Sequence, residues 1–433
     1  MELFNDIKNS LNGALRVLDS GRVFSTKLSS ILLDMALKKS QADVPVKLRE
    51  AFEELGATYI KVGQFIASAP SLFPKEYTIE MQKCLDSVRP LPFSLIKSAI
   101  ESELKGPLTD YFMSIDETPL ASASISQVHA AVTKSGLDVV VKVQRPDIES
   151  TLKTDMGIIY FSSLLFSELT TGIKTSGLLD IVKDFHDSIL LEVDFIQEAK
   201  NIEEFDEYLI KIGETRARVP RVYKELSTKR ILTMERFYGV PLTDLEAIKK
   251  YSKNPKKTLT DALSIWFESL GSAGLFHADV HAGNLLLLND GKIGFIDFGI
   301  VGRISTEVWK GLMLFMQGIG IESAQAMAKG LVLMDSTAKG IDEVRLAKDL
   351  ERVLNELREI SLIAESVGPE ALDEGRLNRL MFDISDISKR NGLKIPREFG
   401  LLIKQMLYFD RYVKILAPEM DLMKDQQLYI PKK

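Results

Sequence analysis

The fold is decided by the segment His277-Ala278-Asp279-Val280-His281-Ala282-Gly283-Asn284, which is followed by Asp297-Phe298-Gly299. Between these segments, the apolar runs Leu285–Leu288 and Lys292–Ile296 flank a turn at Asn289-Asp290-Gly291. Apolar runs around an Asn/Asp-Gly turn predict a β-hairpin. We expect this hairpin to place Asp297 at the end of a strand.

The spacing of Asp279 and Asn284 is that of the protein-kinase catalytic loop, H-R-D-x-x-x-x-N. In that loop the carboxylate meets the accepting hydroxyl group, and the carboxamide binds a metal ion. Asn284 and Asp297 are therefore candidate Mg²⁺ ligands, and Asp279 is a candidate catalytic residue. A lone Asp-Phe-Gly is weak evidence, but the ordered pair of motifs predicts a phosphoryl-transfer site.

Composition describes a globular chain of 433 residues with 45% hydrophobic content and a net charge of -6. The absence of a basic stripe excludes nucleic acid as an expected partner. The single cysteine, Cys84, excludes an intramolecular disulfide and is expected in the core. The first residues lack the pattern of a signal peptide, and no apolar run reaches the roughly 20 residues of a transmembrane helix. We expect a cytoplasmic protein without a transmembrane helix, and leave peripheral membrane association open.

Apolar periodicity divides the chain into three regions. Residues 1–110 predict a helical N-terminal extension, in which a helix pair over Val44–Pro70 is broken at Gly56. Residues 111–238 predict a small β-rich lobe, and residues 239–433 a helical lobe apart from the hairpin before Asp297. The sequence thus predicts an α+β fold of the protein-kinase-like, two-lobed type with a helical extension.

Lys142 ends an apolar run in a second predicted hairpin, Ser126–Thr133 and Asp138–Val143. It matches the V-A-I-K strand, whose lysine reaches the α and β phosphates of ATP. Alone, an edge-strand lysine facing water is the more ordinary interpretation. Its position before Asn284 and Asp297, in kinase order, favours the phosphate-binding one.

An acidic helix is predicted from Leu179 to about Leu209. On such a helix Asp194 and Glu198 share a face, whereas Glu192 lies roughly a third of a turn from Glu198. One carboxylate should pair with Lys142. We favour Glu198, because the small residue beside it permits close packing.

A loop of small residues precedes the second hairpin, where kinases carry a glycine-rich turn that approaches the phosphates. It consists of Ala121, Ser122, Ala123 and Ser124. Small side chains permit close approach, although they adopt positive φ less freely than glycine. We expect this loop to hold nucleotide, and a plain Ser/Ala turn is the open alternative. Backbone groups from Glu235 to Phe237 are expected to bind adenine.

These motifs together resemble the UbiB-like atypical kinases, also called the ADCK family, from about Val44 to Leu422. The matching stretches are Glu54–Gln64, Ala121–Ser124, Gln127–Ala131, Val141–Pro146, Glu192–Phe195, Glu198–Asn201, Phe276–Asp279 and Asp297–Gly299.

The resemblance implies a protein-kinase-like fold whose K-x-G-Q helix, carrying Lys61 and Gln64, packs over the active site. This helix would form a regulatory lid with the E-x-D pair Glu192 and Asp194. The resemblance also implies ATP and Mg²⁺ binding, little protein-kinase activity, and ATPase activity coupled to isoprenoid-quinone or other prenyl-lipid metabolism. Nucleotide, prenyl lipids, a membrane surface and a lipid-biosynthetic enzyme complex are the partners that it implies.

The chain departs from the family pattern in the catalytic loop and in the small-residue loop, and the segment after Gly299 bears on protein substrates. The family usually has H-A-D-P-H-P-G-N, whereas this chain has Val280 and Ala282, so both loop-stiffening prolines are missing. Ser122 replaces the usual alanine and is expected to add a hydroxyl near the phosphates. After Gly299 the chain passes almost directly to Ser305 without an A-P-E segment, so we expect no peptide-docking platform.

Several functions fit these observations. The leading interpretation is an atypical kinase or ATPase in which Asp279 orients the attacking hydroxyl or water. A regulatory nucleotide-binding scaffold with negligible turnover and a small-molecule phosphotransferase are the alternatives. A hydrolytic metal site formed by His277, Asp279 and His281 is disfavoured, because the kinase pattern already assigns Asp279. His277 is expected instead to stabilise the loop by bonding to backbone near Asp297.

Overall fold

The computed structural model describes residues 16, 18–23, 25–26, 29, 43–68, 75–84, 89–169, 182–183, 185–186, 189–190, 192–242, 244–252, 254–272, 274–280, 283–337, 340–367, 387, 390–393, 402, 405, 409 and 413. The chain forms two compact units. Unit 1 contains Met1–Asp206, Val219–Tyr238 and Ile296–Ile300, and unit 2 contains Glu207–Arg218, Gly239–Phe295 and Val301–Lys433. The Asp-Phe-Gly segment therefore belongs to unit 1, whereas the predicted catalytic loop belongs to unit 2.

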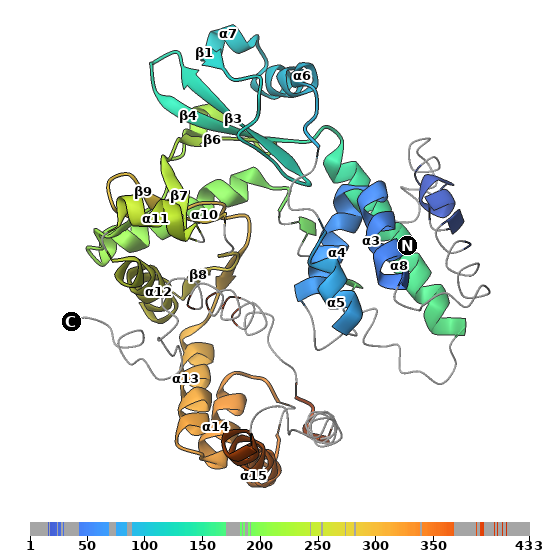
Figure 1. Cartoon of the computed structure of the whole chain (residues 1–433), viewed down its shortest axis with the longest axis vertical. Coiled ribbons are helices and arrows are strands. Elements are labelled where there is room, and N and C mark those ends of the chain that lie inside the picture. The colour runs from blue at the N-terminus through green and yellow to red at the C-terminus, as the bar shows by residue number, and fades with distance from the viewer. Residues whose placement is uncertain are drawn as a thin grey trace. The chain divides into compact units, whose positions relative to one another are not determined.

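Helices of the N-terminal region form a bundle in unit 1 (Figure 1). Its helices are α3 (Asp43–Leu55), α4 (Ala57–Ser68), α5 (Lys75–Met81) and α8 (Ile148–Leu169). The predicted break at Gly56 is confirmed, because this residue has a φ of +89°, which glycine adopts without a steric penalty. Gly63 of the K-x-G-Q motif packs against the buried Cys84, whose sulfur occupies the place of a Cβ atom. The glycine is therefore required by packing within the bundle.

A buried ion pair joins α8 to the junction of α3 and α4. Both carboxylate oxygens of Asp155 accept from Arg16, at 2.7 and 2.8 Å, and one also accepts from Thr58 at 2.6 Å. The Arg16 guanidinium also donates to the Leu55 carbonyl at 2.6 Å. Because the Asp155 carboxylate is fully buried, these donors stabilise its charge and fix the start of α4.

An antiparallel sheet follows the bundle along the chain. Its strands are β1 (Phe112–Ile115), β2 (Ala121–Ser122), β3 (Ser126–Thr133), β4 (Asp138–Gln144) and β6 (Ile231–Glu235), in the order β1-β3-β4-β6 with β2 paired to β3. The predicted hairpin is confirmed as β3 and β4. Lys142 lies in the middle of the sheet, where it pairs with Val128 on β3 and Leu232 on β6. It is thus not an edge-strand residue.

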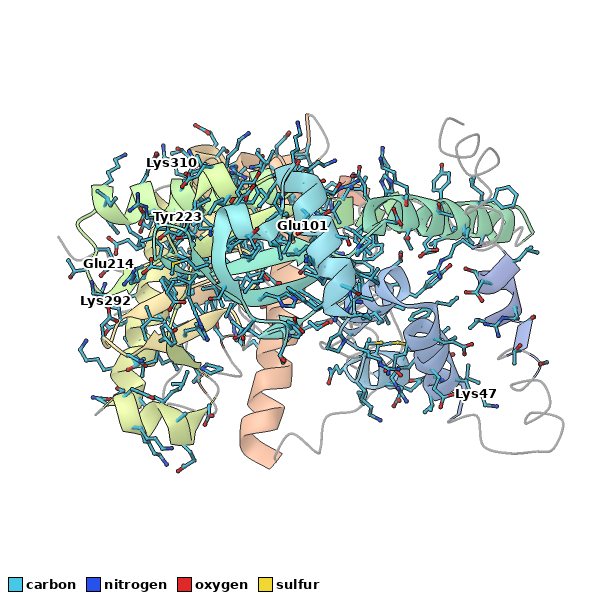
Figure 2. The ribbon with its side chains drawn as sticks, turned by 90° about the horizontal axis from the view of Figure 1, so that it is seen from above. Lys47, Glu101, Glu214, Tyr223, Lys292 and Lys310 are labelled. Atoms are coloured by element: carbon cyan, nitrogen blue, oxygen red, sulfur yellow. The ribbon has the colours of Figure 1, made fainter. Side chains whose placement is uncertain are left out.

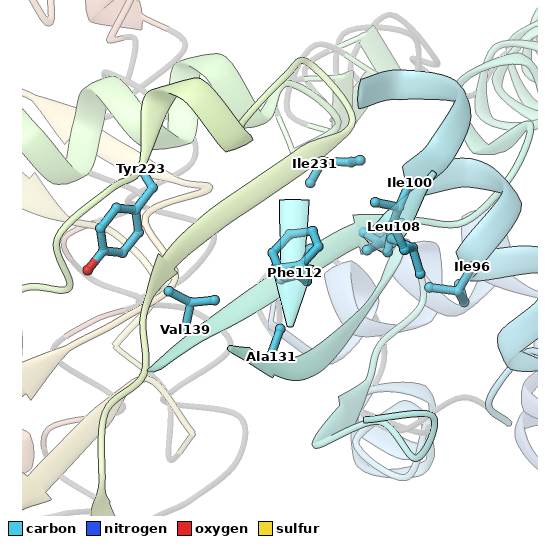
Figure 3. Packing of buried hydrophobic residues seen from close by; sticks show 10 residues of the cluster. Ile96, Ile100, Leu108, Phe112, Ala131, Val139, Tyr223 and Ile231 are labelled. Carbon is cyan, nitrogen blue, oxygen red and sulfur yellow. The ribbon is translucent and has the colours of Figure 1, made fainter. Parts of the chain in front are cut away.

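Helix α6 (Phe93–Leu104) packs on this sheet, although it lies within the predicted extension of residues 1–110. Its Ile96 and Ile100 side chains are fully buried in a cluster with Val139 and Ile231 (Figure 3). Burying each isoleucine stabilises the packing by about 1.5–3 kcal/mol.

Glu101, on the same helix and labelled in Figure 2, accepts a hydrogen bond from the Leu108 backbone N–H at 3.0 Å. This bond satisfies the N–H of the first residue of the short α7 (Leu108–Tyr111), whose N-cap residue is Pro107. The connection between α6 and β1 is therefore fixed.

The acidic helix predicted from Leu179 to about Leu209 is interrupted: the described residues 182–183, 185–186 and 189–190 are helical, and α10 (Phe195–Lys211) begins after a turn. Asp194 caps it, since its carboxylate accepts from the backbone N–H groups of Ile196 and Gln197, both at 3.1 Å. Glu192 lies in a turn before the helix. The prediction that Glu192 shares one continuous helix with Glu198 is therefore wrong, because a capping aspartate ends the helical pattern there.

Unit 2 contains two small sheets and several helices. One sheet has the order β5-β10-β9-β7, with β5 (Ala217–Arg218), β10 (Ile293–Phe295), β9 (Leu285–Leu288) and β7 (Gly239–Pro241). The other pairs β8 (Leu275–His277) with β11 (Val301–Arg303). The described helices are α11 (Leu245–Tyr251), α12 (Pro255–Ser272), α13 (Thr306–Gly320), α14 (Ala324–Leu333) and α15 (Glu343–Val367).

The hairpin predicted before Asp297 is confirmed, because β9 and β10 pair antiparallel with Ile293 opposite Leu287. After Gly299 the chain forms only the short β11 before Ser305 caps α13, at 3.2 Å from the Val308 N–H. Among the described helices, none has the length and apolar content needed to span a membrane.

A chain of buried polar groups links the sheet to the segment before α6. The Leu91 N–H donates to the Gln127 side-chain oxygen at 2.5 Å, and the Gln127 amide lies 3.3 Å from His129 Nε2. His129 Nδ1 lies 2.8 Å from the Asp116 carbonyl, which can only accept. His129 is therefore neutral, with its proton on Nδ1, and burial lowers its pKa.

This arrangement predicts that the protein loses stability as pH falls below about 6.5, the ordinary histidine pKa. The unfolded chain takes up a proton there, whereas the folded chain resists protonation until pH falls through the lower folded pKa. The loss reaches at most about 1.4 kcal/mol per pH unit. Melting temperatures between pH 7.5 and 5.5 measure it, and the non-titrating His129→Gln should show a smaller decrease. Equal decreases in both proteins would contradict the assignment.

Candidate active site

Lys142 is the centre of a charged cluster in unit 1. Its ammonium donates to both carboxylate oxygens of Glu198, at 2.8 and 2.9 Å, and to Asp297 Oδ1 at 3.1 Å. The side chains of Lys142 and Glu198 are only 8% and 1% exposed. The Phe195 ring lies 5.2 Å from the ammonium. Strand β4, helix α10 and the Asp-Phe-Gly segment thus contribute one charged group each.

Electrostatics keep this lysine charged. Burial alone would lower the pKa of Lys142, but the charges of Asp297 and Glu198 more than offset it, and the pKa is raised. Burial also raises the pKa of Glu198 to about 7, an effect that Lys142 opposes. The neighbouring Lys142 ammonium is therefore the group that favours the ionised form of this buried carboxylate. The Lys142 ammonium is therefore a positive charge held in a fixed position, where it suits the binding of an anionic group.

One face of α10 holds the Asp-Phe-Gly segment. Glu198, Asn201 and Phe205 lie three and four residues apart, so they share this face. The Asn201 amide donates to the Phe298 carbonyl at 2.9 Å, and the Phe205 and Phe298 rings lie 5.2 Å apart. Asn201 and Phe298 are buried. The helix that supplies the partner of Lys142 therefore also fixes the backbone beside Asp297.

Asp297 has an unusual backbone conformation, with a φ of +62°. Non-glycine residues adopt this left-handed region only where the surrounding structure enforces it, commonly at functional sites. Here the surrounding structure acts through the next residue, Phe298, which Asn201 and Phe205 hold in place. The Asp297 side chain remains 45% exposed, and it offers the carboxylate oxygen that Mg²⁺ prefers.

Arg145 holds the small-residue loop. Its guanidinium donates to the Ala123 carbonyl at 3.0 Å and to the Ser122 hydroxyl at 2.9 Å. The Ala123 N–H bonds the Ser126 carbonyl at 2.8 Å, and Ser124 is buried. The Ser122 hydroxyl accepts from Arg145 and so contributes to the conformation of the loop, and its role beside the phosphates stays a prediction.

The E-x-D segment connects the site to the K-x-G-Q helix. Lys61 on α4 forms an ion pair with Glu192 at 2.5 Å, and both side chains are mostly buried. Gln144, two residues after Lys142, donates to the Val193 carbonyl at 2.6 Å. The strand that carries Lys142 thus also fixes the turn that carries Glu192.

The other two residues assigned to the lid have different positions. Asp194 is the N-cap of α10, where its carboxylate accepts from backbone N–H groups. Gln64 lies one turn after Lys61 on α4. Asp194 therefore orients the helix that carries Glu198.

The predicted adenine-binding segment begins at the end of β6. The backbone N–H of Glu235 donates to the Arg221 carbonyl at 2.8 Å, so this donor is already used. Phe237 lies beyond the strand, before β7. The expected hinge contacts therefore depend on Phe237 rather than on the Glu235 N–H.

Unit 2 supplies the predicted catalytic loop. The Asp279 N–H donates to His277 Nδ1 at 3.1 Å, and the Asn284 amide donates to the Asp279 carbonyl at 2.8 Å. The second bond fixes the carboxamide by its nitrogen and leaves its oxygen as the atom suited to a metal. His277 contributes to the loop through Nδ1, which accepts from the Asp279 N–H, and its expected bond to backbone near Asp297 stays a prediction.

The competing H-x-D-x-H interpretation needs His281, which lies outside the described residues, as does Ala282. Within the described parts of the chain, no group of three or more His, Cys, Asp or Glu side chains could hold a metal ion.

Several anchoring residues were not predicted from the sequence. They are Gln144, Arg145, Asn201 and Gln405, polar side chains bonded to backbone carbonyl or N–H groups. The first three lie inside the motifs quoted above, and that position was the available signal. Gln405 follows Lys404 in an otherwise largely apolar, helically spaced stretch, and only its burial distinguishes it.

Comparisons with known proteins agree with this geometry. Residues 83–331 match the ABC1 atypical kinase-like domain. An uncharacterized aarF domain-containing protein kinase from Arabidopsis thaliana is 47% identical over 401 residues, which cover 89% of this chain and 74% of that protein. A probable protein kinase UbiB from Aliivibrio fischeri is 29% identical over 387 residues, which cover 87% and 68%.

Among solved structures, a Mycobacterium tuberculosis protein in complex with erythromycin has a TM-score of 0.50 at 21% identity. The alignment covers 94% of this chain and 100% of that chain, and it supports the fold alone. The predicted protein-kinase-like fold is confirmed by these matches. The chain belongs to the ABC1 atypical kinase-like family, together with aarF domain-containing and UbiB kinases.

Proposed function

We propose that this protein binds ATP with Mg²⁺ and transfers the terminal phosphoryl group to water or to a small acceptor. The observation that carries the proposal is the buried Lys142 ammonium, which Glu198 and Asp297 hold at 2.8–3.1 Å. A lysine fixed between an acidic helix and an Asp-Phe-Gly segment is the arrangement that binds ATP phosphates in kinases. Its raised pKa keeps the charge that this task requires.

Each of the two predicted ligands has an oxygen that suits Mg²⁺. Asp297 offers a partly exposed carboxylate. Asn284 offers the oxygen of its carboxamide, because the nitrogen of the same group already donates to the Asp279 carbonyl. Carboxylate and amide oxygens suit Mg²⁺, which usually takes one or two protein ligands and completes its shell with water and phosphate oxygens. When bound, the ion would neutralise charge that develops on the transferred phosphoryl group.

The other predicted residues take roles that follow from their contacts. The backbone of Ala121, Ser122, Ala123 and Ser124, held by Arg145, would approach the phosphates. Main-chain groups near Phe237 would bind adenine. Asp279 would orient the attacking hydroxyl or water as general base. Glu198 would keep Lys142 in position.

A small acceptor or water is favoured over a protein substrate. Only β11 and Ile304 separate Ile300, at the end of the Asp-Phe-Gly segment, from Ser305, the N-cap of α13. Activation segments that dock peptides need a longer loop. The resemblance to UbiB-like kinases supports a role in isoprenoid-quinone or other prenyl-lipid metabolism, at a membrane surface or within a lipid-biosynthetic complex.

A regulatory scaffold that binds nucleotide with negligible turnover is the second candidate. The observation that favours it is the ion pair of Lys61 and Glu192, which connects the K-x-G-Q helix to the turn before α10. Such a helix could report nucleotide occupancy to a partner protein.

Mg²⁺ and ATP together should raise the melting temperature by about 5 °C. Ligand at about 100 times its dissociation constant stabilises a protein by about 2.7 kcal/mol. Thermal-shift measurements with Mg²⁺-ATP and with ATP plus EDTA test this, and Asp297→Asn should reduce the shift. A shift of equal size without Mg²⁺ and in Asp297→Asn would exclude the assigned metal ligand.

Asp279→Asn should lower the rate of phosphate release by about 100-fold or more, because general base catalysis contributes about 10²–10⁴-fold. Nucleotide affinity should stay within about twofold, since this residue is assigned to the acceptor. Phosphate release and equilibrium binding, measured on the same preparations, separate the two effects. A rate that the substitution leaves unchanged would favour the scaffold.

Lys61→Ala and Glu192→Gln should each alter nucleotide turnover by about fivefold, and the double variant should differ little from either one. The reason is that both substitutions break the same ion pair, so their effects are not additive. Turnover of the three variants, and of the charge exchange Lys61→Glu with Glu192→Lys, provides the measurement. Fully additive effects without recovery in the exchange would exclude a shared role in the lid.

A further inference from the structure

The backbone around Asp279 is buried where regular structure ends. Strand β8 stops at His277, and both Ala278 and Val280 are fully buried. A buried N–H or carbonyl group without a partner is strongly unfavourable, so these groups need side chains to bond them.

Gln405 satisfies a group on each side of Asp279. Its amide nitrogen donates to the Ala278 carbonyl at 2.6 Å, and its oxygen accepts from the Val280 N–H at 2.8 Å. Gln405 itself is fully buried. One carboxamide therefore fixes the main chain immediately before and after Asp279.

The stretch that carries Gln405 is anchored in the core of unit 2. The described residues Leu402, Gln405, Phe409 and Val413 are all buried and helically spaced. Phe409 packs edge-on against Trp266 of α12 with ring centroids 4.9 Å apart. Trp266 also donates to the His277 carbonyl at 2.8 Å.

We infer that Gln405 is a positioning residue for Asp279. Its two hydrogen bonds set the backbone conformation from which the Asp279 carboxylate is presented. The C-terminal helical residues thereby take part in the reaction without touching nucleotide. This inference rests on the proposed function for the role of Asp279, but the backbone restraint itself is independent of that function.

Two substitutions of Gln405 separate the effect of its hydrogen bonds from the effect of its packing in the core. Gln405→Met keeps a similar volume and removes both bonds, whereas Gln405→Glu keeps the acceptor and loses the donor. Leu402→Met is the matched control, because it changes a buried residue of the same stretch without affecting a hydrogen bond. Circular dichroism establishes that each variant folds.

The first readout is hydrogen exchange of residues 275–280 in the nucleotide-free protein. Exchange should become about tenfold faster or more in Gln405→Met, change less in Gln405→Glu, and stay at the wild-type rate in Leu402→Met. The second readout is kinetic: kcat should fall about tenfold in Gln405→Met while KM changes less than about twofold.

Wild-type exchange in both Gln405 variants would overturn the inference, as would equal acceleration in Leu402→Met. A Gln405→Met kcat equal to that of the wild type would also overturn it. If the wild-type protein shows no turnover, the proposed function fails, and the exchange measurement still decides whether Gln405 restrains the loop.

Discussion

A buried ammonium group between two carboxylates is the interaction on which the described site depends. Lys142 cannot leave water without compensation, and Glu198 and Asp297 supply it from a helix and from the Asp-Phe-Gly segment. Removing one partner would leave an uncompensated buried charge. The sheet, α10 and the segment that contains Asp297 must therefore adopt their positions together, which explains why Asn201 and Phe205 fix Phe298 from the same helix face.

Polar side chains that bond backbone groups also fix the conformation of the site. Irregular segments carry about half of the predicted site residues, and polar side chains bond several of their buried N–H and carbonyl groups. Arg145 holds the small-residue loop, Gln144 holds the E-x-D turn, and Gln405 holds the loop that contains Asp279. Each of these residues is polar and mostly buried. Each acts by bonding backbone groups of the site, so a search for nucleotide contacts alone would overlook it.

The sequence predicts both hairpins and the pairing of Lys142 with Glu198, because alternation, a glycine turn and helical spacing are local signals. It misplaces Glu192, since Asp194 caps α10 and interrupts a periodic pattern that continues through it. It also misses Gln405, because the bond to Val280 joins residues 125 positions apart and no local pattern encodes such a contact. The cap at Asp194 is a local signal that the helical periodicity outweighed, whereas the Gln405 contact depends on tertiary structure.

The most direct test of the central claim is the affinity of Glu198→Gln for Mg²⁺-ATP, measured by isothermal titration calorimetry against the wild type. The substitution keeps the shape of the side chain and removes the charge that orients the Lys142 ammonium. If that ammonium is the phosphate-binding group, affinity should fall about tenfold or more, equivalent to about 1.4 kcal/mol. Affinity equal to that of the wild type would contradict the account, because the charged cluster would then serve stability alone.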